Sequence, residues 1–375
     1  MWSQQRCLAT VVLALCLTFF LYLNGSLFSS HFRPKETRSS RIVAVGDLHG
    51  DIGNAQKVLE MADVVDAEGN WSGRVDVLVQ TGDIIDRGDD TILLFDWMEQ
   101  LRAQAQAAGG LVLSHLGNHE WMNAIGDWRY VPQSEIKTFG SVAARQRMLS
   151  SGRIGRAWAT NYTTTSRLPL HPSLGTPNSD YPPASPLHIP SSLSHAAYSF
   201  VHGGLSPTYE HLSPFPSAIN AISASLLRKL QTQQPPPVHP PHPYPGLPEG
   251  TTREEYELYD SNGPLWYRGW ALEHETKVCK DVDAVLAKTG TRRMIMGHTP
   301  DFERIVSRCG GKIIIIDTGI SHAYGGVLSA LTVDYTLKPI GGDKWKETEV
   351  VKALYPDKSQ LLVREVTTLK GEFGS

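Results

Sequence analysis

Five short motifs place glycine beside potential metal ligands, and each follows an apolar run of strand length. The motifs are "GDLHGD" (46–51), "GDIIDRGD" (82–89), "GNHE" (117–120), "HGG" (202–204) and "GHTP" (297–300). Their carboxylate, amide and imidazole groups suit hard or borderline metal ions. The candidate ligands are Asp47, His49, Asp83, Asn118, His202 and His298.

A single motif of this kind is equally well explained as a polar turn with an Asp that caps a helix. The combination favours metal binding. Asp47 and His49 are two residues apart, so on an extended backbone they would point to the same side. Asp83 follows the next apolar run, and two carboxylates in one crevice are costly unless a cation joins them. Six ligands exceed one tetrahedral site and fit two metals about 3.5–4 Å apart, bridged by one carboxylate.

The elements that must position these residues are short strands that alternate with helices. Apolar runs bounded by glycine suit strands that are buried on both faces; they lie at 41–45, 75–81, 111–116, 196–201, 292–296 and 312–317. Residues at helical spacing follow the first two runs; they are Ala55, Val58, Leu59 and Ala62, then Leu94, Met98, Leu101 and Ala105. This alternation predicts parallel β-α-β units whose strand ends meet in one crevice.

The ordered set resembles the binuclear, calcineurin-like metallophosphoesterases, and within them the phosphoprotein phosphatase branch, whose signatures look like GDxHG, GDxxDRG and GNHE. The resemblance spans 41–334. "GDWRYVPQSEI" (126–136) and "PLWYRGWA" (264–271) look most like the Shewanella-like protein phosphatases. Many phosphodiesterase relatives carry a second His where this chain has Pro300, and this departure agrees with the phosphatase branch. The resemblance implies a mixed α/β sandwich of two central β-sheets flanked by helices.

The resemblance also implies a role for each residue. Asp47 and His49 would bind the first metal, Asp83 would bridge, and the second metal would take Asn118, His202 and His298. Mn, Fe or Zn would suit these ligands, with Mn favoured. Arg87 would clamp the phosphate through two parallel hydrogen bonds, and Arg268 would be a second clamp. His119, oriented by Asp86, would protonate the leaving group.

The expected function is metal-dependent hydrolysis of a phosphomonoester on phosphoprotein, at Ser/Thr or Tyr, by attack of a metal-bridging hydroxide. Two alternatives stay open. Related bacterial enzymes that hydrolyse dinucleoside polyphosphates share "GDLHG" and "GHTP". An inactive, membrane-tethered scaffold is the other, although all six ligand positions hold competent residues. With a formal net charge of −3 and scattered Lys and Arg, no nucleic-acid partner is expected.

The first 28 residues predict a membrane anchor. Leu8 to Leu23 is an uncharged apolar run, and its continuation to Phe28 reaches about the twenty residues that a bilayer requires. No small-residue exit site follows, which favours an uncleaved anchor over a signal peptide. Residues 29–40 would be a linker and 41–375 the catalytic domain.

We expect an endomembrane or secretory location. The side is open, since Arg33 and Lys35 favour a cytosolic domain whereas sequons at Asn70 and Asn161 suit a lumenal one.

Two segments lack periodicity and predict exposed loops within the domain. Residues 163–194 are rich in Ser and Pro, and residues 231–250 contain a polyproline run. Partners that bind proline-rich peptides are conceivable there, but a solvated insertion is the simpler prediction. Beyond the anchor the chain has two cysteines, Cys279 and Cys309, so one disulfide is possible.

Overall fold

The computed structural model describes residues 36–182, 193, 195–232, 239, 244–371 and 373. The predicted anchor and most of the predicted linker lie outside these residues, as do 183–192 and 233–238 within the two predicted loops. Among the described residues no helix is both long enough and apolar enough to cross a bilayer. The regular elements all belong to one compact unit that begins at Arg38.

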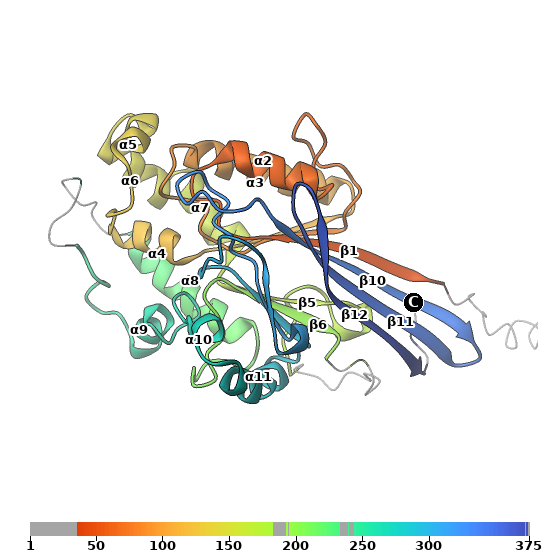
Figure 1. The fold of residues 1–375 in the computed structure, drawn as a ribbon. Coiled ribbons are helices and arrows are strands. Elements are labelled where there is room, and N and C mark those ends of the chain that lie inside the picture. Colours follow the sequence, from red (N-terminus) through yellow and green to blue (C-terminus); the bar gives the residue numbers. More distant parts are fainter. Residues whose placement is uncertain are drawn as a thin grey trace, which may run out of the picture. The chain divides into compact units, whose positions relative to one another are not determined.

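Strands form two sheets (Figure 1). The seven-stranded sheet has the order β12-β11-β10-β1-β2-β3-β4. Its strands are β1 (Arg38–Val45), β2 (Val77–Gln80), β3 (Leu111–His115), β4 (Tyr162–Thr163), β10 (Ala330–Gly341), β11 (Lys344–Leu354) and β12 (Ser359–Lys370). β1 to β4 are parallel, whereas β10 to β12 form an antiparallel meander on the other side of β1. The predicted β-α-β units therefore supply three of the seven strands, β1 to β3.

The second sheet has five strands in the order β5-β6-β7-β9-β8. They are β5 (Thr165–Pro169), β6 (Ala197–Val201), β7 (Arg293–Met296), β8 (Val306–Arg308) and β9 (Ile313–Ile315). β6, β7 and β9 are parallel, and the edge strands β5 and β8 are antiparallel to their neighbours. All six apolar runs are thus strands, and the predicted two-sheet α/β architecture is confirmed.

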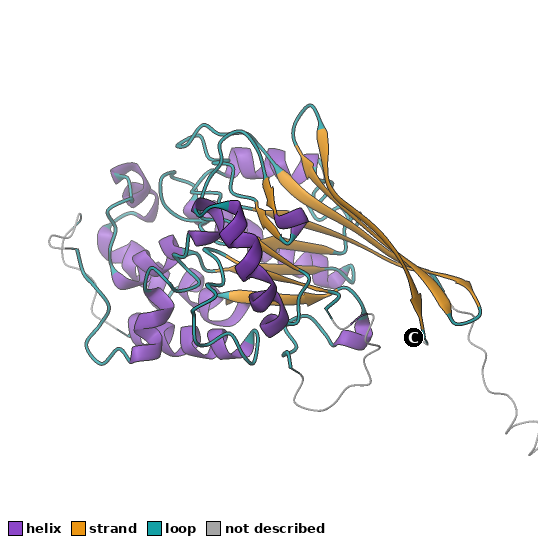
Figure 2. Ribbon diagram, turned by 60° about the horizontal axis from the view of Figure 1, so that its bottom comes forward, coloured by secondary structure: helices purple, strands orange, loops and turns teal. Residues whose placement is uncertain are grey.

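Helices cover the sheets and gather near one end of them, while β10 and β11 extend past the helices (Figure 2). They are α2 (Ile52–Met61), α3 (Thr91–Ala107), α4 (Asn118–Ile125), α5 (Gln133–Phe139), α6 (Val142–Ser150), α7 (Arg153–Asn161), α8 (Ser217–Gln231), α9 (Arg253–Tyr259), α10 (Gly269–Leu272) and α11 (Glu275–Thr289), with 3-10 turns η1 (Pro172–Leu174) and η3 (Cys309–Gly311). The predicted apolar faces of α2 and α3 are fully buried.

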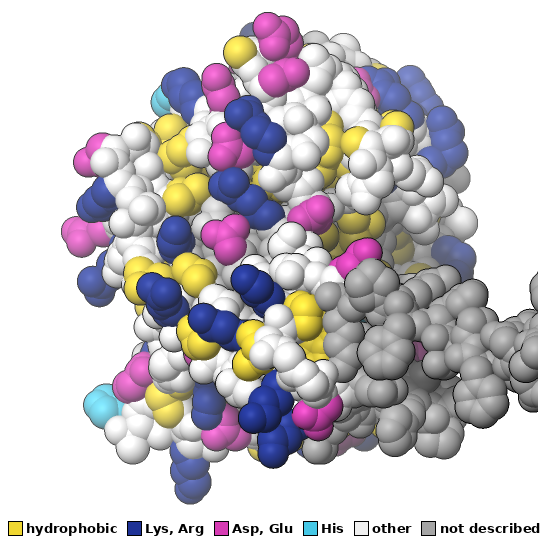
Figure 3. Space-filling model, turned by 90° about the vertical axis from the view of Figure 1, so that its right-hand side faces the viewer, with side chains coloured by type: hydrophobic (Ala, Val, Ile, Leu, Met, Phe, Trp, Pro, Cys, Tyr) yellow, Lys and Arg dark blue, Asp and Glu magenta, His cyan; other side chains and the backbone are white. Residues whose placement is uncertain are grey.

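The core between the sheets is continuous and apolar. Side chains of the first sheet, such as Ile42 and Val333, share one buried cluster with Phe200 and Ile314 of the second. Burying such side chains stabilises the fold by roughly 1.5–3 kcal/mol each. Outside this core, basic and acidic side chains are mixed over the face shown in Figure 3.

Two predicted boundaries were wrong. Residues 163–194 were expected to be an exposed loop, yet Thr165–Pro169 is the edge strand β5. The sequence of this strand is polar, but its polar side chains are buried and hydrogen-bonded within the protein. Arg167, for example, donates to the carbonyl of Gly290. The predicted linker ends early, since 38–40 pair with β10. In the second segment, the described residues 244–250 contain neither helix nor strand, as predicted.

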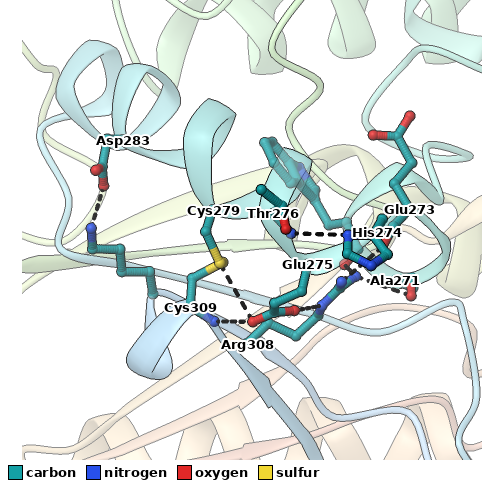
Figure 4. The surroundings of a disulfide bond; sticks show 11 residues. Ala271, Glu273, His274, Glu275, Thr276, Cys279, Asp283, Arg308 and Cys309 are labelled. Atoms are coloured by element: carbon teal, nitrogen blue, oxygen red, sulfur yellow. Dashed lines mark hydrogen bonds and ion pairs between the residues drawn. A yellow bond between two sulfur atoms is a disulfide. The ribbon is translucent and has the colours of Figure 1, made fainter.

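One disulfide joins Cys279 in α11 to Cys309 in η3 (Figure 4). The carboxylate of Glu275 accepts hydrogen bonds from the backbone N–H of Cys309 at 2.9 Å and from Nε of Arg308 at 2.6 Å. Arg308 also donates to the carbonyl of Glu273 at 2.7 Å. The covalent and polar contacts therefore fasten β8 and η3 to the start of α11.

Candidate active site

The predicted ligands come together where β1, β2, β3, β6 and β7 end. The loops are joined by their backbones: His49 N–H bonds the carbonyl of Asp83 at 3.0 Å, and Gly297 N–H bonds that of His202 at 2.9 Å. All six predicted ligands are buried, with at most 4% of the residue surface exposed. Such burial of polar residues requires partners inside the protein or a bound ion.

Asp83 lies at the centre of this cluster. Its Oδ2 is 3.7 Å from Nε2 of His49 and 3.3 Å from Nε2 of His202. Two groups of potential ligand atoms share Asp83, one with His49 and His119 and the other with His202 and His298. An Asp that belongs to both groups has the position that a bridging carboxylate requires. Asn118 Oδ1 lies 2.8 Å from His202 Nε2, on the second side.

Backbone carbonyls orient the histidines. Nδ1 of His49 is 3.0 Å from the carbonyl of Ile85, and Nδ1 of His202 is 3.0 Å from that of Thr81. A carbonyl only accepts, so each Nδ1 carries a hydrogen and donates it, and each Nε2 is the ring nitrogen that faces the cluster. Nε2 of His298 is buried and has no hydrogen-bond partner within the described residues.

The electrostatics fit divalent cations. Burial and the charge of His119 lower the pKa of His49 to about 4, and burial and His202 lower the pKa of His298. Both imidazoles are therefore neutral at pH 7, as metal ligands must be. Burial, with Asp317 and Asp83 nearby, raises the pKa of Asp47. This crowding of carboxylates is relieved by positive ions, and the donor set matches that need.

The backbone is strained at the site. Of the eight non-glycine residues with positive φ in the described part of the chain, five were predicted as site residues: His49, Asp83, Asp86, Arg87 and His298. Such conformations cost about 1–3 kcal/mol each and persist only where the surroundings impose them. They correct one prediction, since β1 ends at Val45 and His49 reaches the site through a left-handed turn with φ of 41°, not along an extended strand.

Two glycines leave room for the carboxylates. A Cβ at position 117 would lie 2.2 Å from Oδ1 of Asp83, and one at position 297 would lie 2.4 Å from Oδ1 of Asp47. Both distances are far below van der Waals contact. The glycines of "GNHE" and "GHTP" are therefore required by the close approach of the backbone to Asp83 and Asp47.

The two predicted clamps border the cluster. Arg87 is exposed, and its guanidinium lies 4.0 Å from the ring centre of Tyr130 and 5.3 Å from that of Tyr324. Nη1 of Arg268 donates to the carbonyl of His298 at 2.8 Å and to Oγ1 of Thr299 at 3.0 Å. Aromatic faces fix the plane of the first guanidinium, and the second is held directly behind a predicted ligand.

His119 and Asp86 form a buried pair, with 2.7 Å between Nδ1 and Oδ2. Burial by itself would lower the pKa of His119, but the charges of Asp83 and Asp86 raise it to about 8. The imidazole is therefore protonated at neutral pH. Its Nε2 lies 3.9 Å from Oδ2 of Asp83, on the side of the cluster, so it can deliver a proton there.

Several residues of the site were not predicted. Glu120 accepts hydrogen bonds from the N–H groups of Asp83, Ile84, Ile85 and Gly117. Its position in the "GNHE" motif could have indicated that it belongs to the site. Tyr324, in "SHAYGG" (321–326), follows the last predicted strand and could have been predicted in the same way. Asn123 and Arg145 lie behind Asp86, and no pattern in the sequence indicates them.

Asp89 and Asp90 end the stretch "GDIIDRGDD" (82–90) and have different partners. Asp90 occupies the N-cap position of α3, but its carboxylate accepts from the N–H of Ile52 in the first turn of α2. Asp89 instead accepts from the hydroxyl of Ser134. Neither residue belongs to the two groups of potential ligand atoms around Asp83.

Comparison with known proteins agrees with this geometry. Residues 40–302 match the family model of the calcineurin-like phosphoesterases. An uncharacterised protein of Schizosaccharomyces pombe is 33% identical over 311 residues, which cover 82% of this chain and 81% of that protein. Shewanella-like protein phosphatase 2 of Arabidopsis thaliana is 26% identical over 337 residues, which cover 80% and 77%.

The crystal structure of a cold-active protein-tyrosine phosphatase from a psychrophilic Shewanella species has the same fold. It aligns with a TM-score of 0.58 and 22% identity over 86% of this chain and 80% of that one. The family match spans all the motifs except the loop of Tyr324. The chain therefore belongs to the calcineurin-like phosphoesterases and is similar, within that family, to the Shewanella-like protein phosphatases.

Proposed function

We propose that this chain is a binuclear metal-dependent protein phosphatase that hydrolyses phosphomonoesters on protein substrates. The main support is the arrangement around Asp83, whose carboxylate belongs to two groups of potential ligand atoms, one with His49 and His119 and the other with His202 and His298. The names of its relatives support a protein substrate, since both a Shewanella-like protein phosphatase and a protein-tyrosine phosphatase are among them.

Each residue has a defined task in this proposal. Bound divalent cations supply an activated water and neutralise phosphoryl oxygens. Asp47 and His49 would hold one ion, and Asn118, His202 and His298 would hold the other, with Asp83 between the two sets. Arg87 and Arg268 bind the phosphoryl oxygens that carry the growing charge.

The leaving group receives its proton from His119. The carboxylate of Asp86 is hydrogen-bonded to Nδ1 of that ring, so Nε2 is the nitrogen that faces the substrate. Because the pKa of His119 is about 8, the acid form is available at neutral pH, which a general acid requires. The proposal needs no covalent phosphoenzyme.

The test uses the purified full chain with manganese, and with a chelator as the negative control. Phosphotyrosine and phosphothreonine peptides are compared with diadenosine tetraphosphate as substrates. We expect chelator-sensitive release of phosphate from at least one peptide class. A clear preference for the nucleotide would contradict a protein phosphatase and favour the dinucleoside polyphosphate alternative. Turnover that persists in metal-free enzyme would contradict the mechanism as a whole.

A further inference from the structure

A buried polar network lies behind the His119–Asp86 pair and has no role in the mechanism so far. Asp86 uses Oδ2 for His119, while Oδ1 accepts a hydrogen bond from Nδ2 of Asn123 at 2.8 Å. Oδ1 also lies 3.6 Å from Nη2 of Arg145. Arg145 and Asp86 are completely buried, and Asn123 is 1% exposed.

Arg145 is held from several sides. Nη1 donates to Oδ1 of Asn123 at 2.7 Å, and Nη2 lies 3.3 Å from both carboxylate oxygens of Glu135. The ring of Trp128 lies 4.5 Å from the guanidinium carbon. Its position is therefore set by a carboxylate, an amide and an aromatic face. Nε of Arg145 is buried and has no hydrogen-bond partner within the described residues. The contacts of this side chain are therefore made through Nη1 and Nη2.

The network joins separate elements at one point. Arg145 comes from α6 and Glu135 from α5, the two short helices inserted between α4 and α7. Asn123 comes from α4, and its Nδ2 also donates to the carbonyl of His119 at 2.9 Å. The inserted helices thus place a cation behind the proton donor, although they contribute no residue to the ligand cluster.

We propose that Arg145 is a positioning residue for proton delivery to the leaving group, acting through Asn123 and Asp86 on His119. The carboxylate torsion of Asp is soft, and contacts on Oδ1 hold its plane so that Oδ2 stays on Nδ1. This inference rests on the proposed function, because it assumes that His119 is the acid.

The test compares substrates whose leaving groups differ in their need for a proton. p-Nitrophenolate departs without help, whereas phenolate and serine alkoxide depend on general acid catalysis, which contributes about 10²–10⁴-fold. In Arg145→Gln we expect kcat for phenyl phosphate to fall about tenfold more than kcat for p-nitrophenyl phosphate. Equal losses on both substrates, or no loss, would mean that Arg145 has only a structural role.

Arg167→Gln is the matched control. Arg167, in β5 of the second sheet, is 1% exposed and donates to the carbonyls of Gly290 and Leu174. It should lower thermal stability without changing the ratio between the two substrates. Arg145→Lys keeps the charge but replaces the planar fork that bonds Asn123 and Glu135 by a single ammonium group. It carries the test if the Gln variant does not fold, and an unchanged ratio in it would overturn the proposal.

A double-mutant cycle with Asp86→Asn separates this inference from the proposed function. If Arg145 acts through Asp86, Arg145→Gln should add no further selective loss once Asp86 is replaced. Additive effects would overturn the proposal. If Asp86→Asn by itself leaves the substrate ratio unchanged, the assignment of the general acid is wrong. If Asp86→Asn shifts the ratio and Arg145→Gln does not, only the role of Arg145 is wrong.

Discussion

At the scale of single residues, neighbouring carboxylates of one motif have unrelated surroundings. Asp83 lies between three imidazoles. Burial would raise its pKa, but His202 and His119 beside it hold that pKa well below the ordinary value. Asp86, three residues later, faces away from the ligands toward Asn123. Asp89 is exposed and bonds Ser134. The same side chain can therefore serve as ligand, orienting group or surface residue.

Asp83→Asn tests the central ligand. Removing this charge while the shape is kept should lower kcat/KM for p-nitrophenyl phosphate by more than the roughly 10–100-fold typical of groups that only support ligands. Metal content, measured by mass spectrometry after gel filtration, should fall as well. Asp89→Asn removes a carboxylate from the same motif and should leave activity and metal content unchanged. Wild-type metal content in Asp83→Asn would contradict its place between two ions.

At the scale of elements, a buried ionic cluster joins the two sheets. Glu349 in β11 lies 2.5 Å from Nε of Arg293 in β7 and 2.7 Å from Nη1 of Arg292, and it accepts a hydrogen bond from Tyr198 in β6. Burial would raise the pKa of Glu349, but the two arginines hold it below its ordinary value of 4.5. The cluster therefore links elements that are distant in the chain through a charge inside the core.

Glu349→Gln should lower the free energy of unfolding by about 3–5 kcal/mol, because the buried Arg293 loses its buried carboxylate partner and keeps the half-exposed Glu365. The wild-type carboxylate contributes fully above pH 4.5, and its contribution is lost as pH falls through the lower pKa of the folded state. The difference between the two proteins should therefore shrink in acid. Urea unfolding at several pH values measures it.

Glu365→Gln is the control for this cluster. Its carboxylate also bonds Arg293, at 3.0 Å, but its side chain is 52% exposed. A surface pair of this kind contributes at most about 1 kcal/mol. Equal destabilisation by the two substitutions would show that burial does not govern the contribution of Glu349.

The disulfide is the second contact between elements that can be tested. It closes a loop across 30 residues, so its removal by Cys279→Ser together with Cys309→Ser should lower the free energy of unfolding by about 3–4 kcal/mol. Urea unfolding of the oxidised wild type, the reduced wild type and the double variant measures this. The reduced wild type and the variant should agree, and a reduced protein as stable as the oxidised one would contradict the expectation.

At the scale of the whole molecule, the N-terminal anchor is still a prediction. We expect the full chain expressed in a eukaryotic cell to stay with membranes in alkaline carbonate and to be released by detergent, whereas a chain lacking residues 1–35 should be soluble. The disulfide and an exposed Asn161 support a domain on the lumenal side. For a lumenal domain, glycosidase treatment should increase the gel mobility of the protein, and Asn161→Gln should abolish part of that shift. Release of the full chain by carbonate would contradict the anchor.

The sequence by itself predicted the six strands that end in the motifs, the α/β class and the candidate ligands that the structure brings together. It could do so because each of these depends on short patterns, namely apolar runs, glycines and polar residues at fixed spacing. Thr165–Pro169 was missed because its buried polar groups are bonded to residues far away in the chain, so local polarity was misleading. The meander of β10 to β12 also lay beyond the predicted strands.

Only the tertiary structure decided how the residues act on one another. The left-handed backbone at Asp83 and His298, the sharing of Asp83 between two ligand groups and the pKa of His119 all depend on loops that meet in space. Arg145 is the clearest case, since it follows Asp86 by 59 positions and reaches it from an inserted helix. Electrostatic and packing interactions fall off with distance in space, not with separation along the chain, so no local pattern could reveal them.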